Sequence, residues 1–329
     1  MIAAPETMHA LCFNEFGGPE VLYYGPVPRP EVQPGTVLLR TRAIGLNYAD
    51  VYRRRGNYHL VGQPPYILGY EAAGEIVAVG EGVTGAHIGQ RAAVADVPHA
   101  NAEYILVPQD HLIALPDDVT FEQAAAVLLQ GLTAQYLTAD SYCLRPHDLA
   151  VVHAVAGGVG LLLTQIIRAR GGRVIGLTSS EAKRQEALRA GAEAVFLYSE
   201  PWEKLVLDYR PECLGADVVY ESVGSTLPQS LAATRTGGTV VFFGMAGGDP
   251  APVDPRTLMD TSKTLTGGDL WNHLTSRTER ETRANALFKL MRAGQLTANI
   301  GATFPLADGA AAHRLLESRL STGKILLLP

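Results

Sequence analysis

One stretch of the chain, residues 149–172, constrains the fold more than any other: an apolar run, then clustered glycines, then a helical pattern. The apolar run is continuous and β-branched, which is typical of a strand buried on both faces of a parallel sheet. Gly157, Gly158 and Gly160 lack a Cβ, so the backbone can approach a pyrophosphate closely. Apolar residues at helical spacing over 159–169 predict a helix whose N-terminal N–H groups and positive dipole end face the glycines. The stretch therefore predicts a phosphate site.

The glycine pattern is incomplete, because Val155 stands where the first glycine of G-x-G-x-x-G is expected. Taken alone, it also fits a tight strand-to-helix turn without a ligand. The next predicted strand, 172–177, separates the cofactors, since NAD enzymes place Asp or Glu at its end to hold the ribose 2′-hydroxyl. Here Ser179 and Lys183 follow, and hydroxyls with a cation suit a 2′-phosphate, although Glu181 nearby would oppose one. We expect NADPH; the alternative for Lys183 is a solvated helix residue.

Length and charge narrow the class of protein. At 329 residues the chain is long for one core, so we expect two domains. The formal net charge of −6 and the absence of a basic run argue against nucleic acid as the main partner. No apolar stretch approaches the roughly 20 residues of a membrane span, and the first residues lack the pattern of a secretory signal. We expect a cytoplasmic protein that does not enter a membrane.

Cysteine and histidine give no sign of a metal or of disulfides. Cys12, Cys143 and Cys213 are odd in number and widely spaced, which excludes a disulfide framework and a C-x-x-C metal pair. We expect them to be core or neutral thiols. The nine histidines form no H-E-x-x-H or similar cluster, so no bound catalytic zinc is expected.

The first part of the chain is predicted to be mainly β, with glycine punctuation that suits a small twisted barrel. Its expected strands are 8–13, 21–24, 36–44, those within 66–85, 91–94 and 103–107. An Ala-rich helical pattern at 121–138 is interpreted as the junction between domains. Thr133 in this helix is expected near the cofactor groove.

A polar, aromatic segment at 45–58 interrupts the β pattern and is expected to be partly helical. It carries Asn47, Asp50, Tyr52 and Tyr58, whose amide, carboxylate and phenol groups are candidates for chemistry. For each, the structural alternative is at least as strong: a helix cap for the polar pair, or a tyrosine packed on a core.

After the glycine loop, helix and strand alternate, which predicts a doubly wound parallel sheet with ligands at the carboxyl ends of its strands. Those ends carry Tyr198, Ser222 and Gly244. Tyr198 is a candidate to flank the adenine ribose, with an ordinary surface tyrosine as the alternative. The predicted helices are 181–190, 201–209, 227–235 and 280–294, and the predicted strands are 194–197, 217–220, 239–243, 265–268 and 325–328.

Several motifs together give the chain a family resemblance: GLNYADVYRRRG, GYEAAGEIVAVGEGV, LLQGLTAQYL, HAVAGGVG, VVYESVG and ESRLSTGKILLLP. End to end, the chain resembles the medium-chain dehydrogenase/reductase superfamily, and within it the zinc-free NADPH:quinone oxidoreductases related to zeta-crystallin. The resemblance implies an α/β protein with a GroES-like twisted β-barrel catalytic domain at 1–128, completed by 269–329. It also implies a Rossmann domain at 129–268 and a homodimer.

Differences from the zinc alcohol dehydrogenases are informative. Those relatives have G-H-E where this chain has Gly69, Tyr70 and Glu71, and they place a cysteine near the position of Asn47. They also carry a four-cysteine structural lobe that is absent here. Without a Lewis acid, hydride transfer needs an acceptor that is already electrophilic, such as a quinone or an α,β-unsaturated carbonyl.

The resemblance also implies roles for single residues. Asn47 and Thr133 would lie beside the nicotinamide, and Tyr52 would line the substrate cleft, with Asn47 and Tyr52 as the catalytic candidates. Arg319 would join Lys183 at the 2′-phosphate, which requires the chain's tail to fold back. The alternative for Arg319 is a surface arginine in the last helix. The remaining implied cofactor contacts are Gly157, Gly158, Val159 and Gly160 at the pyrophosphate, Tyr198 beside Lys183 and Arg319 at the 2′-phosphate, and Ser222 and Gly244 along the ribose and bridge. Ser179 is a further candidate contact because of its hydroxyl.

Two departures from the family pattern affect the expected nicotinamide pocket: Glu221 replaces the usual Asp, and Met245 with Ala246 replaces a more polar turn. The leading hypothesis is a metal-free hydride transfer from NADPH to a quinone, with Tyr52 or water as the proton donor. One alternative is an NADPH-dependent enoyl or alkenal reductase. Another is a non-catalytic NADPH-binding protein, structural or RNA-binding, as the crystallin relative suggests.

Overall fold

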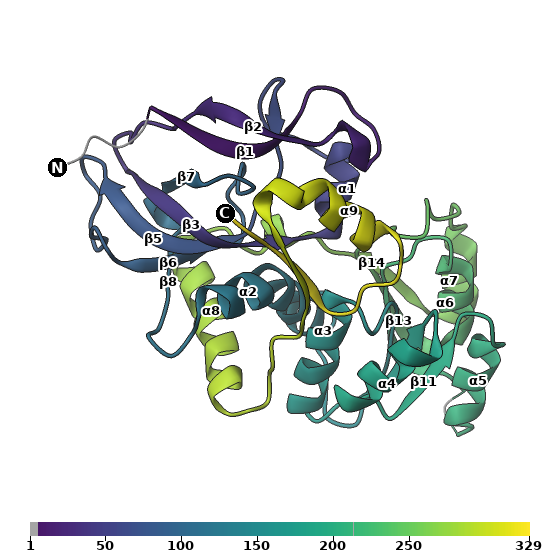
Figure 1. Ribbon diagram of the computed structural model, residues 1–329. Helices are drawn as coiled ribbons and strands as arrows, with labels where there is room; N and C mark the ends of the chain where they lie inside the picture. The colour runs from purple at the N-terminus through teal and green to yellow at the C-terminus, as the bar shows by residue number, and fades with distance from the viewer. Residues whose placement is uncertain (1–5, 213) are drawn as a thin grey trace. The chain divides into compact units, whose positions relative to one another are not determined.

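The computed structural model describes residues 6–212 and 214–329 (Figure 1), so Cys213 lies outside the described residues. The chain divides into two compact units. Unit 1 comprises the described residues up to Leu129, together with Leu274–Phe288 and Ala298–Pro329. Unit 2 comprises Gln130–His273 and Lys289–Thr297. The predicted domain limits at 128/129 and 268/269 stay a prediction.

Unit 1 is built on two β-sheets. In the smaller, β1 (Thr7–Phe13) pairs antiparallel with both β2 (Tyr23–Pro28) and β4 (Tyr66–Ile67). The larger has the order β15-β16-β3-β5-β6-β8, with β7 also beside β3. Its strands are β3 (Thr36–Leu46), β5 (Ala72–Val79), β6 (Arg91–Val94), β7 (Tyr104–Pro108), β8 (Ile113–Ala114), β15 (Ile300–Pro305) and β16 (Lys324–Leu328).

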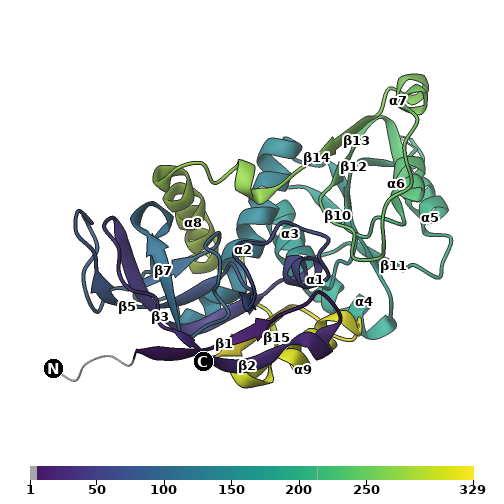
Figure 2. The same ribbon diagram turned by 90° about the horizontal axis from the view of Figure 1, so that it is seen from above.

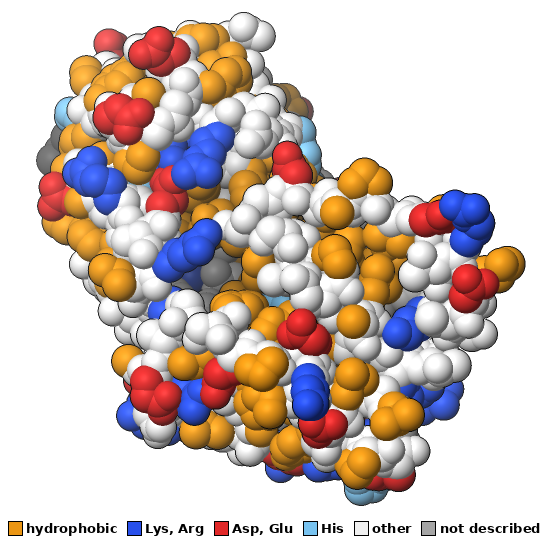
Figure 3. Space-filling view, turned by 90° about the vertical axis from the view of Figure 1, so that its right-hand side faces the viewer, with side chains coloured by type: hydrophobic (Ala, Val, Ile, Leu, Met, Phe, Trp, Pro, Cys, Tyr) orange, Lys and Arg blue, Asp and Glu red, His pale blue; other side chains and the backbone are white. Residues whose placement is uncertain are grey.

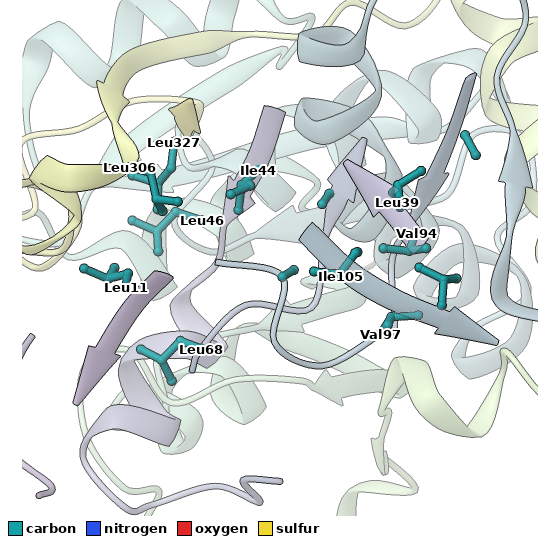
Figure 4. Close-up of a cluster of buried hydrophobic side chains, with 14 of the residues drawn as sticks. Leu11, Leu39, Ile44, Leu46, Leu68, Val94, Val97, Ile105, Leu306 and Leu327 are labelled. Carbon is teal, nitrogen blue, oxygen red and sulfur yellow. The ribbon is translucent and has the colours of Figure 1, made fainter. Parts of the chain in front are cut away.

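The core of unit 1 gathers apolar side chains from strands that are far apart in sequence (Figure 4). Leu39 and Ile44 of β3, Ile105 of β7 and Leu327 of β16 are all fully buried there. Along β3 the exposed Arg40 alternates with buried neighbours, as expected of a strand with one covered face. Burial of this apolar surface is the main force that holds the unit together.

The end of the chain is an internal part of unit 1. β16 lies between β15, to which it is parallel, and β3, to which it is antiparallel. Helix α9 (Gly309–Glu317) packs against β15 and β16 and also contacts β2. In Figures 1 and 2 the yellow C-terminal segment accordingly lies beside the purple N-terminal strands. The remaining helices with residues in this unit are α1 (Tyr48–Arg54), α2 (Phe121–Tyr136) and α8 (Arg277–Arg292), the last two of which continue into unit 2.

Unit 2 is a parallel sheet in the order β11-β10-β9-β12-β13-β14, which confirms the predicted doubly wound sheet (Figure 2). Its strands are β9 (Leu149–Val152), β10 (Arg173–Thr178), β11 (Ala194–Leu197), β12 (Ala216–Glu221), β13 (Thr234–Phe242) and β14 (Thr264–Gly267). Its further helices are α3 (Gly158–Ala169), α4 (Glu181–Arg189), α5 (Trp202–Tyr209), α6 (Leu227–Ala233) and α7 (Pro255–Thr261).

Both faces of this sheet are covered. Leu149 and Val151 of β9 pack with side chains of α5 and α6 in one cluster, while the intervening Ala150 and Val152 are equally buried on the other face. A strand buried on both sides needs no polar alternation, which explains the continuous apolar run at 149–152. The strand order reverses between β9 and β12, and in open α/β sheets such a switch point is where ligands bind.

Some sequence predictions differ from the structure. The strand predicted at 21–24 starts only at Tyr23, because Pro19–Val21 forms a 3₁₀ turn, and it continues to Pro28. The helix predicted at 227–235 ends at Ala233, and β13 begins at the next residue. Helix α7 and strand β15 had not been predicted. None of the described helices is long and apolar enough to cross a membrane.

Candidate functional site

The predicted phosphate loop connects β9 to α3 in unit 2. Gly157 is the N-cap of α3, and Gly158, Val159 and Gly160 form its first turn. A Cβ at Gly160 would lie 2.5 Å from the carbonyl oxygen of Ala154, and one at Gly158 would lie 2.1 Å from the side-chain oxygen of Gln130. Helix geometry leaves the N–H groups of this first turn without intrahelical acceptors. The loop is therefore a close-packed backbone cradle suited to a phosphate.

The end of β10 carries the residues expected to select a 2′-phosphate. Ser179 is exposed, and Ser180 is the N-cap of α4, where its Oγ accepts from the Lys183 N–H at 3.5 Å. Lys183 therefore lies in the first turn of α4. The Glu181 carboxylate, expected to oppose a phosphate, forms an ion pair with Arg184 at 3.3 Å, which offsets its charge. The local chemistry fits an anion.

Tyr198, which follows β11, is not an ordinary surface tyrosine. Its hydroxyl accepts from the Ala154 N–H at 2.9 Å and lies 3.2 Å from Nδ1 of the buried His153. On the other side of the imidazole, Nε2 lies 2.9 Å from Ser230 Oγ, and that hydroxyl donates to Glu221 at 2.5 Å. A Ser230 hydroxyl that donates to a carboxylate must accept from Nε2–H, so Nδ1 accepts from Tyr198. Burial lowers the pKa of His153 to about 4, consistent with this neutral ring.

Glu221, at the end of β12, organises the turn that carries Ser222. Its carboxylate accepts from the N–H groups of Val223 and Gly224 at 2.7 and 3.0 Å. Burial raises the pKa of Glu221, but the adjacent His153 and the hydrogen bonds from Ser230, Gly224 and Val223 lower it, and the net shift is downward, so the carboxylate stays charged. The end of β13 lies alongside, because a Cβ at Gly244 would be 3.2 Å from the Ser222 carbonyl oxygen. The structure thus brings the two predicted contacts Ser222 and Gly244 together.

In unit 1 the polar segment forms α1, and Asn47 is its N-cap, as the structural alternative for this residue anticipated. The backbone N–H of Asn47 donates to the Asp50 carboxylate at 3.0 Å. Asp50 is fully buried and also faces Arg53, whose guanidinium lies over the rings of Tyr58 and Tyr70. Asp50 is therefore part of a buried structural cluster whose Arg53 also contacts the half-buried Tyr58.

Tyr52 lies on α1 and is half-buried. Its ring meets the ring of Tyr48 edge-on, with centroids 5.3 Å apart. Burial raises the pKa of Tyr48, so the Tyr48 phenol is protonated at neutral pH.

The Asn47 side chain belongs to a buried polar cluster that the sequence did not reveal. Lys324 Nζ donates to Asn47 Oδ1 at 2.8 Å and to Glu71 Oε2 at 2.6 Å. Asn47 Nδ2 donates to the same Glu71 oxygen at 2.9 Å, and the other Glu71 oxygen accepts from the Leu129 N–H at 2.7 Å. The sequence did contain one indication of this cluster: Lys324 directly precedes the apolar run of the last strand. A lysine is rarely buried without a charged partner, so its position beside a buried strand indicates one.

Arg319 follows α9 in unit 1, is exposed, and has a positive φ of 61°. The end of α9 is tied to α1 by Glu317, which forms ion pairs with Arg54 and Arg55. Lys183 and Tyr198 belong to unit 2, so their predicted meeting with Arg319 at one phosphate stays a prediction. The same holds for Asn47 and Tyr52 of unit 1 with the half-buried Thr133 of unit 2.

Two domain families match successive parts of the chain. Residues 33–147 match the alcohol dehydrogenase GroES-like domain, and residues 158–287 match the zinc-binding dehydrogenase domain. A quinone oxidoreductase of Pseudomonas aeruginosa is 40% identical over 96% of this chain and 98% of its own length. This chain belongs to the quinone oxidoreductase family.

Other members extend the likeness. The solved structure of Escherichia coli quinone oxidoreductase complexed with NADPH is 34% identical, covers 98% of this chain and 100% of its own, and superposes with a TM-score of 0.93. The 2-haloacrylate reductase of a Burkholderia species is 35% identical over 97% of this chain and 98% of its own length. As a quinone oxidoreductase family member, the chain is an oxidoreductase of GroES-like and Rossmann architecture within the medium-chain dehydrogenases/reductases.

The zinc of the matching domain name does not fit the residues present in this family member. The cysteine and histidine positions described above hold Asn47 and Tyr70, and the Lys324 ammonium lies 2.6 Å from the adjacent Glu71 carboxylate. An ammonium is a donor without a lone pair and cannot ligate a dication. Across residues 6–212 and 214–329, His, Cys, Asp and Glu form no group of three or more that could hold a metal ion.

Proposed function

We propose that this oxidoreductase transfers a hydride from NADPH to a quinone without a metal. The observation that carries the proposal is the Asn47, Glu71 and Lys324 cluster, which fills the place of a zinc site with an amide and an ion pair. Such a site cannot act as a Lewis acid on an alcohol or a simple ketone. An acceptor whose electrophilicity is intrinsic, as in a quinone, needs none.

The cofactor is NADPH, and the residues of unit 2 fit it. Gly157, Gly158, Val159 and Gly160 are proposed to hold the pyrophosphate, because the first N–H groups of α3 have no acceptor within the helix and a side chain at Gly160 would collide with the Ala154 backbone. Ser179, Lys183 and Tyr198 are proposed to surround the adenosine and its 2′-phosphate, with Arg319 contributed from unit 1. When bound, NADPH supplies a hydride from C4 of its nicotinamide.

The protein's own contribution is orientation, exclusion of water and delivery of one proton. Asn47 and Thr133 are proposed to position the nicotinamide, with Ser222 and Gly244 along the ribose. Reduction of a quinone to a hydroquinone consumes the hydride and one proton, and the Tyr52 hydroxyl or water is proposed to give that proton to the quinone oxygen.

The first experiment measures NADPH and NADH oxidation by the purified protein with a panel of quinones, an alkenal, an enoyl thioester and a simple ketone. We expect quinones with NADPH to react fastest and the ketone to be inert. Tyr52→Phe is expected to lower kcat if its hydroxyl gives the proton, and an unchanged kcat would assign that step to water. Rapid ketone reduction would overturn the metal-free assignment.

A second candidate is a reductase of conjugated carbon–carbon double bonds, which the likeness to a 2-haloacrylate reductase favours. The hydride step and the cofactor are the same, but a saturated carbonyl product distinguishes it from a hydroquinone. A non-catalytic RNA-binding role has less support, because the net charge is −6 and basic and acidic side chains are interspersed on the face in Figure 3. NADPH binding without oxidation by any acceptor would favour a binding role.

We further propose a homodimer that forms through the edge of the unit 2 sheet. β14 is the terminal strand of that sheet and pairs with β13 on one side. An exposed strand edge offers backbone groups to a second copy of the same strand. Light scattering that gives the mass of a monomer at micromolar concentration would contradict this.

A further inference from the structure

The buried cluster at Asn47 sets the orientation of an amide. Asn47 Oδ1 receives the Lys324 ammonium, while Nδ2 donates to the Glu71 carboxylate and, at 3.1 Å, to the Gly45 carbonyl oxygen. Exchanging the amide's oxygen and nitrogen would set NH₂ against an ammonium and oxygen against two acceptors. Only one orientation of the Asn47 amide therefore satisfies its hydrogen bonds to Lys324, Glu71 and Gly45.

The cluster is isolated from water. The side chains of Lys324 and Glu71 are 1% and 0% exposed, and Asn47 is 5% exposed. Burial lowers the pKa of Lys324, and the Glu71 carboxylate opposes that shift. A buried ion pair is weak evidence for a gain in stability, because the cost of desolvating the two charges offsets their attraction.

The three members come from distant parts of the chain. Asn47 follows β3, Glu71 precedes β5, and Lys324 is the first residue of β16, 277 positions from Asn47. The pairing of Leu326 with Gly45 in the β3 and β16 ladder fixes where Lys324 stands. The closing strand thus delivers a cation to the start of α1.

We propose that Lys324 is a positioning residue: with Glu71 it holds the Asn47 amide in the single orientation that meets the nicotinamide. The inference rests on the proposed function, which places Asn47 beside that ring. Lys324 would then affect binding of the cofactor and not binding of the substrate. The rival explanation is that Lys324 only balances the buried charge of Glu71.

The test uses a pair of substitutions that removes both charges and two of the hydrogen bonds that orient the Asn47 amide. Lys324→Met alone leaves the Glu71 carboxylate without its cation and is expected to lower the melting temperature. Lys324→Met with Glu71→Gln removes both charges. The oxygen of the amide introduced by Glu71→Gln keeps the Leu129 N–H, so the NH₂ of that amide faces Asn47 Nδ2 and cannot accept from it, while the hydrogen bond from Nδ2 to the Gly45 carbonyl oxygen stays.

The readout is the affinity for NADPH compared with 2′-phospho-ADP-ribose, which lacks the nicotinamide. In the double variant we expect the Kd for NADPH to rise about tenfold, equivalent to about 1.4 kcal/mol, while the Kd for the fragment stays within about twofold. An equal loss for both ligands, or no loss for either, would overturn the proposal. Binding is measured without an acceptor, so failure of the quinone assignment leaves this result unaffected.

Further variants distinguish positioning of Asn47 from charge balance. Asn47→Ala is expected to weaken NADPH but not the fragment, and in that background the double substitution should add nothing, because its effect acts through Asn47. Additive losses would assign Lys324 to charge balance alone. The matched control, Arg42→Met with Glu75→Gln, removes an ion pair between β3 and β5 that is 39% and 37% exposed, and should change neither affinity.

Discussion

Burial and the adjacent Arg54 keep the side chain of His313 neutral. Its Nδ1 lies 2.8 Å from a guanidinium nitrogen of Arg54, and arginine can only donate, so the imidazole accepts. Burial and the charge of Arg54 lower the pKa of His313 to about 3. Below its ordinary pKa the unfolded chain binds a proton here that the folded chain does not.

This difference predicts acid sensitivity with a definite sign. Between pH 6.5 and about 3 the unfolded state holds more protons, so stability falls as the pH falls through that window. From pH 7 to pH 5 this one group should cost about 2 kcal/mol. His313→Asn keeps an acceptor near Nδ1 but does not titrate, and urea unfolding at several pH values should show a flatter profile. The exposed His87→Asn is the control, and an equally steep profile for His313→Asn would refute the assignment.

Lys183 should govern the choice between the two cofactors. Its place in the first turn of α4, next to Ser179, predicts that its charge meets the 2′-phosphate. Lys183→Ala is expected to lower kcat/KM for NADPH by about tenfold, because a charge-assisted contact is lost, and to leave NADH nearly unchanged. Steady-state kinetics with both cofactors check this. Lys204→Ala on α5 is the matched control, and equal losses with both cofactors would contradict the role.

At the level of elements, the join between β9 and α3 depends on Gly160. The carbonyl oxygen of Ala154 leaves no room for a Cβ there, whereas a Cβ at Gly157 would lie at 3.1 Å from the same oxygen. Gly160→Ala is therefore expected to lower the free energy of unfolding by about 1–3 kcal/mol. Gly157→Ala, with φ at −79°, should cost less stability. Urea unfolding of the two variants tests the difference, and equal stability would show that the loop relaxes freely.

The elements that the sequence predicted best are those whose own pattern is sufficient. β9 and α3 have a continuous apolar run and a helical period, and both formed within a few residues of the predicted limits. Only the start of β2 was predicted, because Pro26 and Pro28 suggest a loop, yet a strand that pairs on one side tolerates proline. Local pattern cannot show which edge a strand will occupy.

Local sequence pattern predicts even less of the candidate site than of the secondary structure. Gly157, Gly158 and Gly160 could be predicted because a loop beside a helix N-terminus is a local feature. Lys324 and Glu71 could not, since they lie 253 positions apart and meet only through the sheet. Contacts that depend on the register of distant strands are not encoded in any short window.

At the level of the whole molecule, unit 1 depends on both ends of the chain. β16 covers the edge of β3 and contributes Leu327 to the same core as Leu39. A fragment of residues 1–129 would expose this edge and part of the core. We expect it to lack a cooperative thermal transition by circular dichroism, while the chain shortened only by the exposed Pro329 keeps one. Cooperative unfolding of the fragment would contradict this dependence.

The position of β16 also determines the order in which the two units can be completed during synthesis. Synthesis proceeds at about 5–20 residues per second, so roughly 15–55 s separate the emergence of Leu46 from that of its partner Ile325. The strands of unit 2, from Leu149 to Gly267, are all translated before that partner appears. Unit 2 can therefore fold before unit 1 is complete, and the first strands of unit 1 stay without β16 for most of translation.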